Sequence, residues 1–318
     1  MNLQRARAFG VDRPWTSGAP PFSTTPAFGK RGFTLLEMLL VIAMIGTLAA
    51  LLLPVMGAAK TKAQAVGCLN NTRQVTLAWH LYSTDYNDAV ANNFGISQTV
   101  DAIQNGRLEN WINNVMTWGA SEGIEDASNT NVAWVTGGAL GRYTAGGVGV
   151  YKCPADTALS PSQLRADFRQ RNRSISMNSV FGLYTSLAQA NDPGLNWAFP
   201  QYRQYLKQAQ VPRPSKTWLF VDEHPDTIND GNFVSNPALD FWQDIPASYH
   251  NGACGFSFAD GHSEIRSWRS GTSKYNGVLF AYDRPRMSFD KPGGADFAWY
   301  LERTGYVYAK TGEQAFNY

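Results

Sequence analysis

The segment "DEHPDTINDGN", residues 222–232, is the densest group of polar side chains in the sequence. Carboxylate and amide oxygens in a short, glycine-containing loop are the donors that calcium prefers, because this cation takes roughly six to eight oxygen ligands. Calcium is therefore a candidate cofactor of this segment, while Asx turns without a metal are the favoured interpretation. The candidate calcium ligands are Asp222, Glu223, Asp226 and Asp230. The spacing matches no EF-hand, and a series of Asx turns without a metal explains the same composition.

His250 and Asp260 lie at the two ends of "HNGACGFSFAD", with nine residues between them. The alternating phenylalanines of this segment predict a strand, and "ADG" predicts the turn after it. We expect His250 and Asp260 to form a structural pair, a hydrogen bond that braces two neighbouring strands. A zinc or iron site is the alternative for these side chains. Its ligands would come from His224, His250, His262, Asp222 and Asp260.

The three cysteines, Cys68, Cys153 and Cys254, are too few for a disulfide framework, and their spacing matches no zinc motif. If the later part of the chain faces an oxidising compartment, Cys153–Cys254 is the expected disulfide, because Cys68 falls on a predicted helix close to a membrane.

A thiol hydrolase is one alternative function. Cys153 or Cys254 would be the nucleophile, His250 the base, and Asp260 or Asp222 the orienting acid. Neither cysteine lies in a nucleophile motif, and no glycine-rich helix start supplies an oxyanion hole. We therefore expect no enzymatic activity.

A binding module for sugars or other ligands is a second alternative. Tryptophans in glycine- and asparagine-rich loops offer flat apolar faces on which such ligands stack. The tryptophans concerned are Trp111, Trp118, Trp134, Trp197, Trp242, Trp268 and Trp299. Nucleic acid is excluded as a partner, because the formal net charge is only +2 and no basic patch is present. The arginines of residues 165–173 fit a solvated helix face better than a phosphate track.

A membrane segment precedes all of these residues. Residues 1–32 form a basic leader rich in proline and glycine, and residues 33–55 are almost entirely apolar. A bilayer span takes about 20 residues, and the basic flank places its N-terminal end in the cytoplasm. We predict a single pass through the inner membrane, with the later chain in the periplasm. The apolar run continues into an amphipathic helix, which disfavours an ordinary signal peptide.

Glu37 is the one acid in this apolar run, where a carboxylate costs about 2.5 kcal/mol or more. The stretch around it, "KRGFTLLE", resembles the prepilin peptidase site of type IV pilins and type II secretion pseudopilins. The resemblance implies cleavage after Gly32, methylation of the new amine at Phe33, and Glu37 as the fifth residue of the mature chain. Pro54 adds to it, since many pilins carry a helix-breaking proline there.

The same resemblance implies assembly. Cleavage creates an ammonium group at Phe33, and the Glu37 carboxylate of a neighbouring subunit would pair with it and set the register between helices. The implied partners are prepilin peptidase, like or related pilin subunits, an inner-membrane assembly platform and the lipid bilayer. The product would be an extracytoplasmic filament, either a pilus or a type II secretion pseudopilus. Pseudopilins that hold calcium in the head also support the predicted calcium site.

Blocks of the later chain carry a second resemblance. "HNGACGFSFADG", "YKCPAD", "RSISMN" and "FVDEHPDTINDGNF" are similar to segments of large pilin-like proteins of planctomycete- and verrucomicrobium-type bacteria, marked by an H-x9-DG pattern. This resemblance implies the family without implying a more specific role.

The predicted fold is α+β, with a long N-terminal helix packed on the antiparallel sheet of a pilin-like head. The helix covers residues 33–86, the head covers residues 87–318, and a stripe containing Trp79, Tyr82 and Tyr86 faces the head core. The head is expected to contain one helix, at residues 160–171. The expected strands are "VAWVTG", "GVYKC", "RSISMN", "TWLFVDE", "GFSFADG", "HSEIRSW" and "GYVYA".

Overall fold

The computed structural model describes residues 32–107, 110–184, 196, 198–199, 202–275, 277–282 and 286–305. The predicted leader before Gly32 lies outside these residues, as does the predicted strand "GYVYA" after its first glycine. The chain divides into two compact units at the bond between Leu53 and Pro54.

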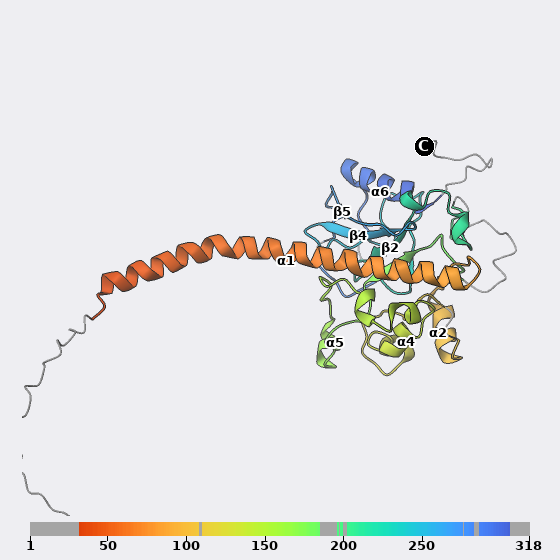
Figure 1. Cartoon of the computed structure of the whole chain (residues 1–318), viewed down its shortest axis with the longest axis horizontal. Helices are drawn as coiled ribbons and strands as arrows, with labels where there is room; N and C mark the ends of the chain where they lie inside the picture. The colour runs from red at the N-terminus through yellow and green to blue at the C-terminus, as the bar shows by residue number, and fades with distance from the viewer. Residues whose placement is uncertain are drawn as a thin grey trace, which may run out of the picture. The chain divides into compact units, whose positions relative to one another are not determined.

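The first element is a single helix, α1, Leu35–Asp85, which confirms the predicted long helix (Figure 1). Its helical assignment continues through Pro54, so no turn of the helix is lost at this proline. After the helix, Asn87 and Asp88 take positive φ angles of 51° and 68°, and the chain turns away.

The second half of α1 packs into the core of the later unit. Cys68, Thr72, Val75 and Trp79 are completely buried, at the spacing of three and four residues that places side chains on one helix face. Trp79 meets Phe181 edge to face, with ring centroids 5.6 Å apart. The predicted core position of Trp79 is confirmed.

The predicted core position of Tyr86 is wrong. This side chain is 45% exposed, and its ring stacks on Tyr82, which packs only partly buried against the core.

The sheet has five strands in the order β3-β1-β2-β4-β5. Their bounds are β1 Ile175–Asn178, β2 Trp218–Asp222, β3 Asn232–Phe233, β4 Ala253–Phe258 and β5 Ser263–Ser267. Four expected strands are thereby confirmed. The pairs β1–β2, β2–β4 and β4–β5 are antiparallel, but β3 runs parallel to β1. The α+β class is therefore correct, whereas the sheet is mixed.

Two expected strands are helical instead. "VAWVTG" forms α4, Val132–Thr136, because the Asn131 side chain caps it by accepting the Ala133 N–H. "GVYKC" forms the 3₁₀ helix η2, Val148–Tyr151. Short apolar runs fit a buried helical turn as well as a strand, and at α4 the Asn131 cap favours the helix.

The helix expected over residues 160–171 is much shorter. Ser160 and Gln163 form the capping box of α5, Pro161–Arg165, and the helix then ends. Other helical elements of the described chain were not expected. They are α2 Ile96–Gln104, α3 Ile124–Ala127, η1 Gly141–Thr144, η4 Gln208–Gln210, η5 Pro214–Lys216 and α6 Lys291–Thr304.

Two clusters of buried side chains hold the later unit together. One surrounds Trp79 and Trp111 and includes residues of β1 and β2. The other joins Phe297 and Tyr300 of α6 to Trp218 and Phe256 of the sheet. Figure 1 shows α6 next to β4 and β5, where Asp290 opens it by accepting the Gly293 N–H. Phe297 and Tyr300 are three residues apart, the spacing of one helix face, and this signal for α6 is absent from the expected elements.

Candidate functional site

The predicted calcium ligands bind separate neighbours in the structure. Asp226 accepts the N–H groups of Leu279 and Phe280, at 2.8 and 2.9 Å. Asp230 accepts the Asn232 N–H at 2.8 Å, which is an Asx turn. Glu223 accepts the Ser176 hydroxyl at 2.5 Å.

Asp222, the fourth predicted calcium ligand, lies in a different group of side chains. Among described residues, only one group of three or more His, Cys, Asp or Glu side chains is placed to hold a metal ion, and it contains Asp222 alone of the four acids. The four acids therefore do not converge on one site among the described residues, and the calcium site stays a prediction.

The basic cluster expected on a solvated face is partly buried. Arg171 and Arg173 are completely buried, whereas Arg165 and Arg169 are exposed. Arg171 lies over the Trp118 ring, 4.3 Å from its centroid, and 3.8 Å from the Asp156 carboxylate.

Arg173 is surrounded by acceptors from several elements. It donates to Asn114 Oδ1 at 2.8 Å, to the Ile175 carbonyl at 2.8 Å, and to the Asp230 carbonyl at 2.6 Å. Burial lowers its pKa to about 10 and raises the pKa of nearby Glu223 well above the usual range. This guanidinium is a structural centre of the head.

The predicted pairing of His250 with Asp260 is wrong. Asp260 lies in the β4–β5 turn, where its Oδ1 is 2.6 Å from the Nδ1 of His262. His250 precedes β4, and its Nε2 lies 3.4 Å from Cys153 Sγ and 3.8 Å from Asp222 Oδ2. The two residues sit at opposite ends of β4, so the strand itself separates them. The ligands of the alternative zinc or iron site are separated as well: His250 lies beside Asp222, whereas His262 lies beside Asp260.

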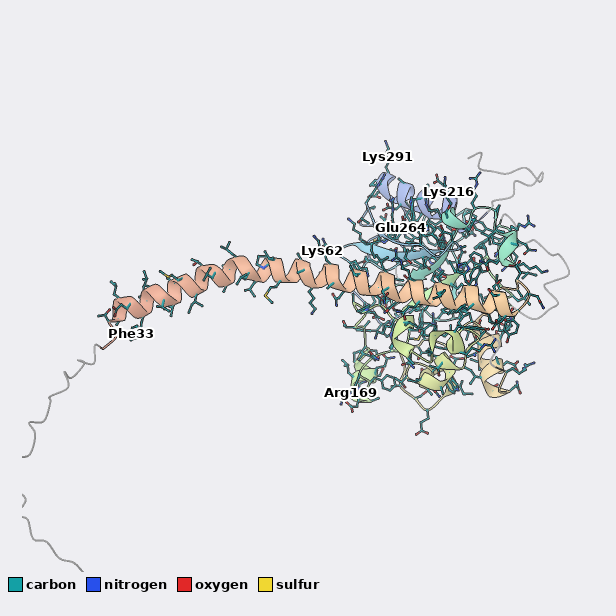
Figure 2. The ribbon with its side chains drawn as sticks, viewed as in Figure 1. Phe33, Lys62, Arg169, Lys216, Glu264 and Lys291 are labelled. Atoms are coloured by element: carbon teal, nitrogen blue, oxygen red, sulfur yellow. The ribbon has the colours of Figure 1, made fainter. Side chains whose placement is uncertain are left out.

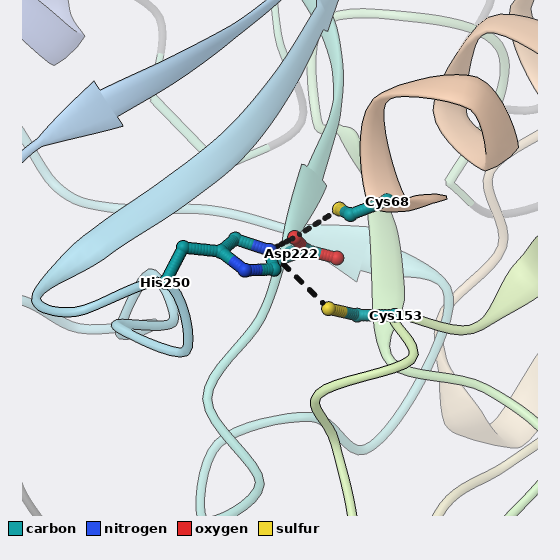
Figure 3. A group of neighbouring side chains, drawn as sticks. All are labelled: Cys68, Cys153, Asp222 and His250. Atoms are coloured by element: carbon teal, nitrogen blue, oxygen red, sulfur yellow. Dashed lines mark hydrogen bonds and ion pairs between the residues drawn. The ribbon is translucent and has the colours of Figure 1, made fainter. Parts of the chain in front are cut away.

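Four side chains from four segments converge where His250 points (Figure 3). Cys68 comes from α1, Cys153 follows η2, and Asp222 ends β2. Their ligand atoms and the His250 nitrogen all lie within 4.8 Å of one another. We call this group, Cys68, Cys153, Asp222 and His250, the Cys–His cluster.

The Cys–His cluster is buried and electrostatically coupled. Cys68, Cys153 and Asp222 are completely buried and His250 is 6% exposed. The Cys68 thiol donates to Asp222 Oδ2 at 2.7 Å, and the Ala155 N–H donates to Cys153 Sγ at 3.4 Å.

The thiols and the imidazole of the cluster have shifted pKa values. The hydrogen bond between the two cysteines raises the pKa of Cys68 well above its ordinary value and lowers the pKa of Cys153. Burial lowers the pKa of His250, but hydrogen bonds to Asp222 and Cys153 outweigh it and raise that pKa to about 9.

The expected Cys153–Cys254 disulfide is absent from the structure. All three cysteines are free thiols, and Cys153 contacts the Cys–His cluster. The Cys254 thiol instead donates to the Asp222 carbonyl oxygen at 3.2 Å, and burial raises its pKa well above the ordinary value.

The cluster does not have the geometry of a hydrolase triad. In a triad, the nucleophile and the acid contact different nitrogens of the histidine. Here Cys153 and Asp222 both face Nε2, while the buried Nδ1 has no hydrogen-bond partner among described residues. One nitrogen that faces three other donor atoms is the arrangement of a metal ligand.

The described tryptophans do not line a common exposed surface. Trp111, Trp118, Trp242 and Trp268 are buried, and Trp134 and Trp299 are half-buried. Trp197 lies outside the described residues. The buried rings supply the head core, as the two side-chain clusters around them show.

The N-terminal residues of α1 form a second site of interest. Phe33 precedes the helix, and Thr34 and Glu37 close its first turn. Both the Thr34 N–H and its hydroxyl donate to Glu37 Oε2, at 2.8 and 2.9 Å, and the Glu37 N–H donates back to Thr34 Oγ1 at 3.2 Å. This is a capping box, which satisfies orphan donors at a helix start.

Apolar side chains cover the first part of α1 on all sides. Every residue from 32 to 60 is exposed, and Figure 2 shows these side chains from Phe33 onward. By length and composition this helix can cross a membrane, the only such helix among described residues. A helix that is apolar on all sides needs lipid or partner helices around it, because exposing so large an apolar surface to water is unfavourable.

Comparison with known families decides how this segment is interpreted. Residues 28–53 match the prokaryotic N-terminal methylation motif. The motif spans the predicted cleavage site, Glu37 and nearly all of the apolar segment, and it ends just before Pro54. No curated protein and no solved structure matches the chain.

The methylation motif identifies a type IV pilin-like prepilin signal at the N-terminus. Such a signal implies processing by a prepilin peptidase and fits anchoring of the chain in a membrane through α1. The match does not extend to the H-x9-DG segment, residues 250–261. It therefore concerns the N-terminal signal alone and does not bear on the second resemblance.

Sequence patterns missed the Cys–His cluster because its members are far apart along the chain. Zinc motifs are recognised in a sequence by ligands a few residues apart, and no two ligands of this cluster lie that close along the chain. One useful signal was present. Cys68 lies on the buried stripe of α1, so its thiol had to face the head core.

Proposed function

We propose that this chain is the precursor of a pilin-like or pseudopilin-like subunit. It is cut after Gly32, methylated at Phe33, and assembled through the first part of α1 into a pilus or a type II secretion pseudopilus. The observation that carries the proposal is the match of residues 28–53 to the methylation motif, on a helix whose apolar residues are exposed on all sides.

The proposed mechanism is assembly without turnover. The apolar half of α1 holds the subunit in the inner membrane, with the head in the periplasm, until it moves into the fibre. Apolar side chains then exchange lipid contacts for contacts with neighbouring helices, and the Glu37 carboxylate pairs with the Phe33 ammonium group of a neighbour. The partners are prepilin peptidase, like or related subunits and the inner-membrane assembly platform.

The decisive experiment is intact-mass and N-terminal analysis of the protein from membranes of cells with and without prepilin peptidase. We expect a chain that begins at methylated Phe33 only where the peptidase is present. A chain that still begins at Met1 in both would refute the processing step.

A glycine substitution sharpens this test. A Cβ atom at Gly32 would meet no atom of the described residues within 4 Å, so we expect Gly32→Leu to leave the described part of the chain undisturbed. Loss of the mature band in this variant therefore reports on recognition by the peptidase. Gly57→Ala is the matched control, because Gly57 is equally free of neighbours and lies beyond the motif. It should be processed as the wild type is.

A further inference from the structure

The Cys–His cluster has the composition of a closed site for a divalent transition metal. It offers two sulfurs, one imidazole nitrogen and one carboxylate oxygen, all within 4.8 Å of one another. Four protein ligands without an open position are typical of structural zinc sites. Thiolate ligands disfavour calcium and magnesium, which prefer oxygen.

The distances within the cluster approach those of a tetrahedral site. With metal–ligand bonds of about 2.0–2.3 Å, neighbouring ligand atoms of tetrahedral zinc lie about 3.3–3.8 Å apart. Cys153 Sγ and His250 Nε2 are 3.4 Å apart, and His250 Nε2 and Asp222 Oδ2 are 3.8 Å apart. Cys68 Sγ and Asp222 Oδ2 are closer, at 2.7 Å, because a proton joins them.

Three further features of the site fit a bound metal ion. A Cβ atom at Gly255 of β4 would lie 2.8 Å from both Cys68 Sγ and Asp222 Oδ2, so the absence of a side chain keeps room for the cluster. Asp222 Oδ1 is buried without a hydrogen-bond partner among described residues, which leaves acceptor capacity in the site. The Ala155 N–H points at Cys153 Sγ and stabilises negative charge there.

From this arrangement we propose that Cys68, Cys153, Asp222 and His250 bind one zinc ion, which fastens α1 to the end of β2 and to the two loops beside it. Binding displaces the protons of the Cys68 and Cys153 thiols and the proton on Nε2 of His250, all of which are released to solvent, and the neutral imidazole then coordinates through Nε2. No bond is oxidised or reduced. The ion replaces the proton between Cys68 and Asp222, and its binding energy adds to the stability of the folded head.

The test uses the full chain, purified in detergent with a reductant and loaded with zinc alone. We expect one zinc ion per chain, and a lower melting temperature after a chelator removes it. Cobalt(II) in place of zinc should show the strong visible bands of a tetrahedral site and thiolate-to-cobalt charge transfer. These measurements use the wild-type chain, so they decide the proposal even if variants fold poorly.

Single substitutions then assign the ligands. Loss of a residue that only hydrogen-bonds a metal ligand costs about 10- to 100-fold in metal affinity. Cys68→Ser and Cys153→Ser each remove a ligand itself, so each should weaken zinc binding by at least about that factor. Cys254→Ser is the matched control, because Cys254 is an equally buried thiol that bonds the Asp222 carbonyl and lies outside the cluster. Gly255→Ala keeps all four ligands but narrows the site, and it should also weaken binding.

Three results would overturn the proposal. The wild type could take up no stoichiometric zinc and give an octahedral cobalt spectrum. Cys254→Ser could weaken zinc binding as much as Cys68→Ser. Protein isolated from membranes without a reductant could carry a Cys68–Cys153 disulfide, seen as a mass lower by two hydrogen atoms, and the cluster would then be a redox pair.

Discussion

Thr34 and Glu37 bond each other reciprocally across the first turn of α1, at distances of 2.8 to 3.2 Å. Glu37 therefore has a role within its own helix, in addition to the proposed pairing with Phe33 of another subunit. The two roles depend on different properties. The cap needs a hydrogen-bond acceptor at this position, whereas pairing between subunits needs a negative charge.

Glu37→Gln should be cut after Gly32 but should not assemble, because the amide keeps an acceptor for the cap and loses the charge. Thr34→Ala removes the capping hydroxyl and keeps the carboxylate, and we expect it to form fibres. The measurement is the amount of mature protein in the sheared-fibre fraction, compared with the amount in membranes. Normal fibres from Glu37→Gln, or no fibres from Thr34→Ala, would assign Glu37 to the cap alone.

Trp79→Ala should loosen the contact between α1 and the rest of the head. Trp79 is completely buried, and removal of such a side chain costs about 3–5 kcal/mol. Leu77→Ala is the control on the same helix, because Leu77 is 58% exposed and its loss should change the free energy of unfolding by about 0.5 kcal/mol or less. Urea unfolding of the full chain in detergent measures both, and equal losses would refute the assigned packing.

Arg173→Lys should destabilise the head although it keeps the charge. The ammonium group cannot reproduce the fork that reaches Asn114, Ile175 and Asp230, and buried acceptors left unpaired cost about 1–3 kcal/mol. Arg169→Lys, at an exposed position, should leave the unfolding midpoint unchanged. A neutral effect of Arg173→Lys would mean that this network does not stabilise the fold.

Stability should fall between about pH 4 and pH 6 because of Asp230. Burial raises its pKa to about 6, outweighing the opposing effects of the Asn232 N–H and of Arg173. The folded chain therefore binds this proton more tightly than the unfolded chain, whose aspartates have a pKa of about 3.9. The contribution is fully present below about pH 4 and is lost as the pH rises through about 6, a change of about 3 kcal/mol.

Asp230→Asn isolates this effect, because an amide oxygen can still accept the Asn232 N–H and the side chain no longer titrates. We expect the difference in unfolding free energy between wild type and variant to change by about 3 kcal/mol from pH 4 to pH 7, in favour of the variant at the higher pH. A pH-independent difference would show that Asp230 titrates normally in the folded chain.

Local patterns predicted the elements that local energetics determine. The long apolar and amphipathic helix was expected from its periodicity, and α1 follows it closely. The strands β1, β2, β4 and β5 were also expected, because turn residues bound each of them. The parallel strand β3 was missed since it is only Asn232–Phe233, and its pairing with β1 is a tertiary contact.

The wrong predictions arose where tertiary contacts outweigh local pattern. Arg171 and Arg173 belong to a basic run that suggests a solvated face, yet buried acceptors and the Trp118 ring hold both inside. His250 and Asp260 share a conspicuous spacing, yet β4 lies between them and directs them to different partners.

The sequence by itself determined the N-terminal signal, the apolar segment and the place of Glu37, because a peptidase site and a membrane span are properties of consecutive residues. Only the tertiary structure decided which polar side chains of the head meet. Cys68, Cys153, Asp222 and His250 come together because α1 packs on the sheet and two loops close over the end of β2. This convergence depends on how the helix, the strands and the loops pack together, and the spacing of residues within one segment does not predict that packing.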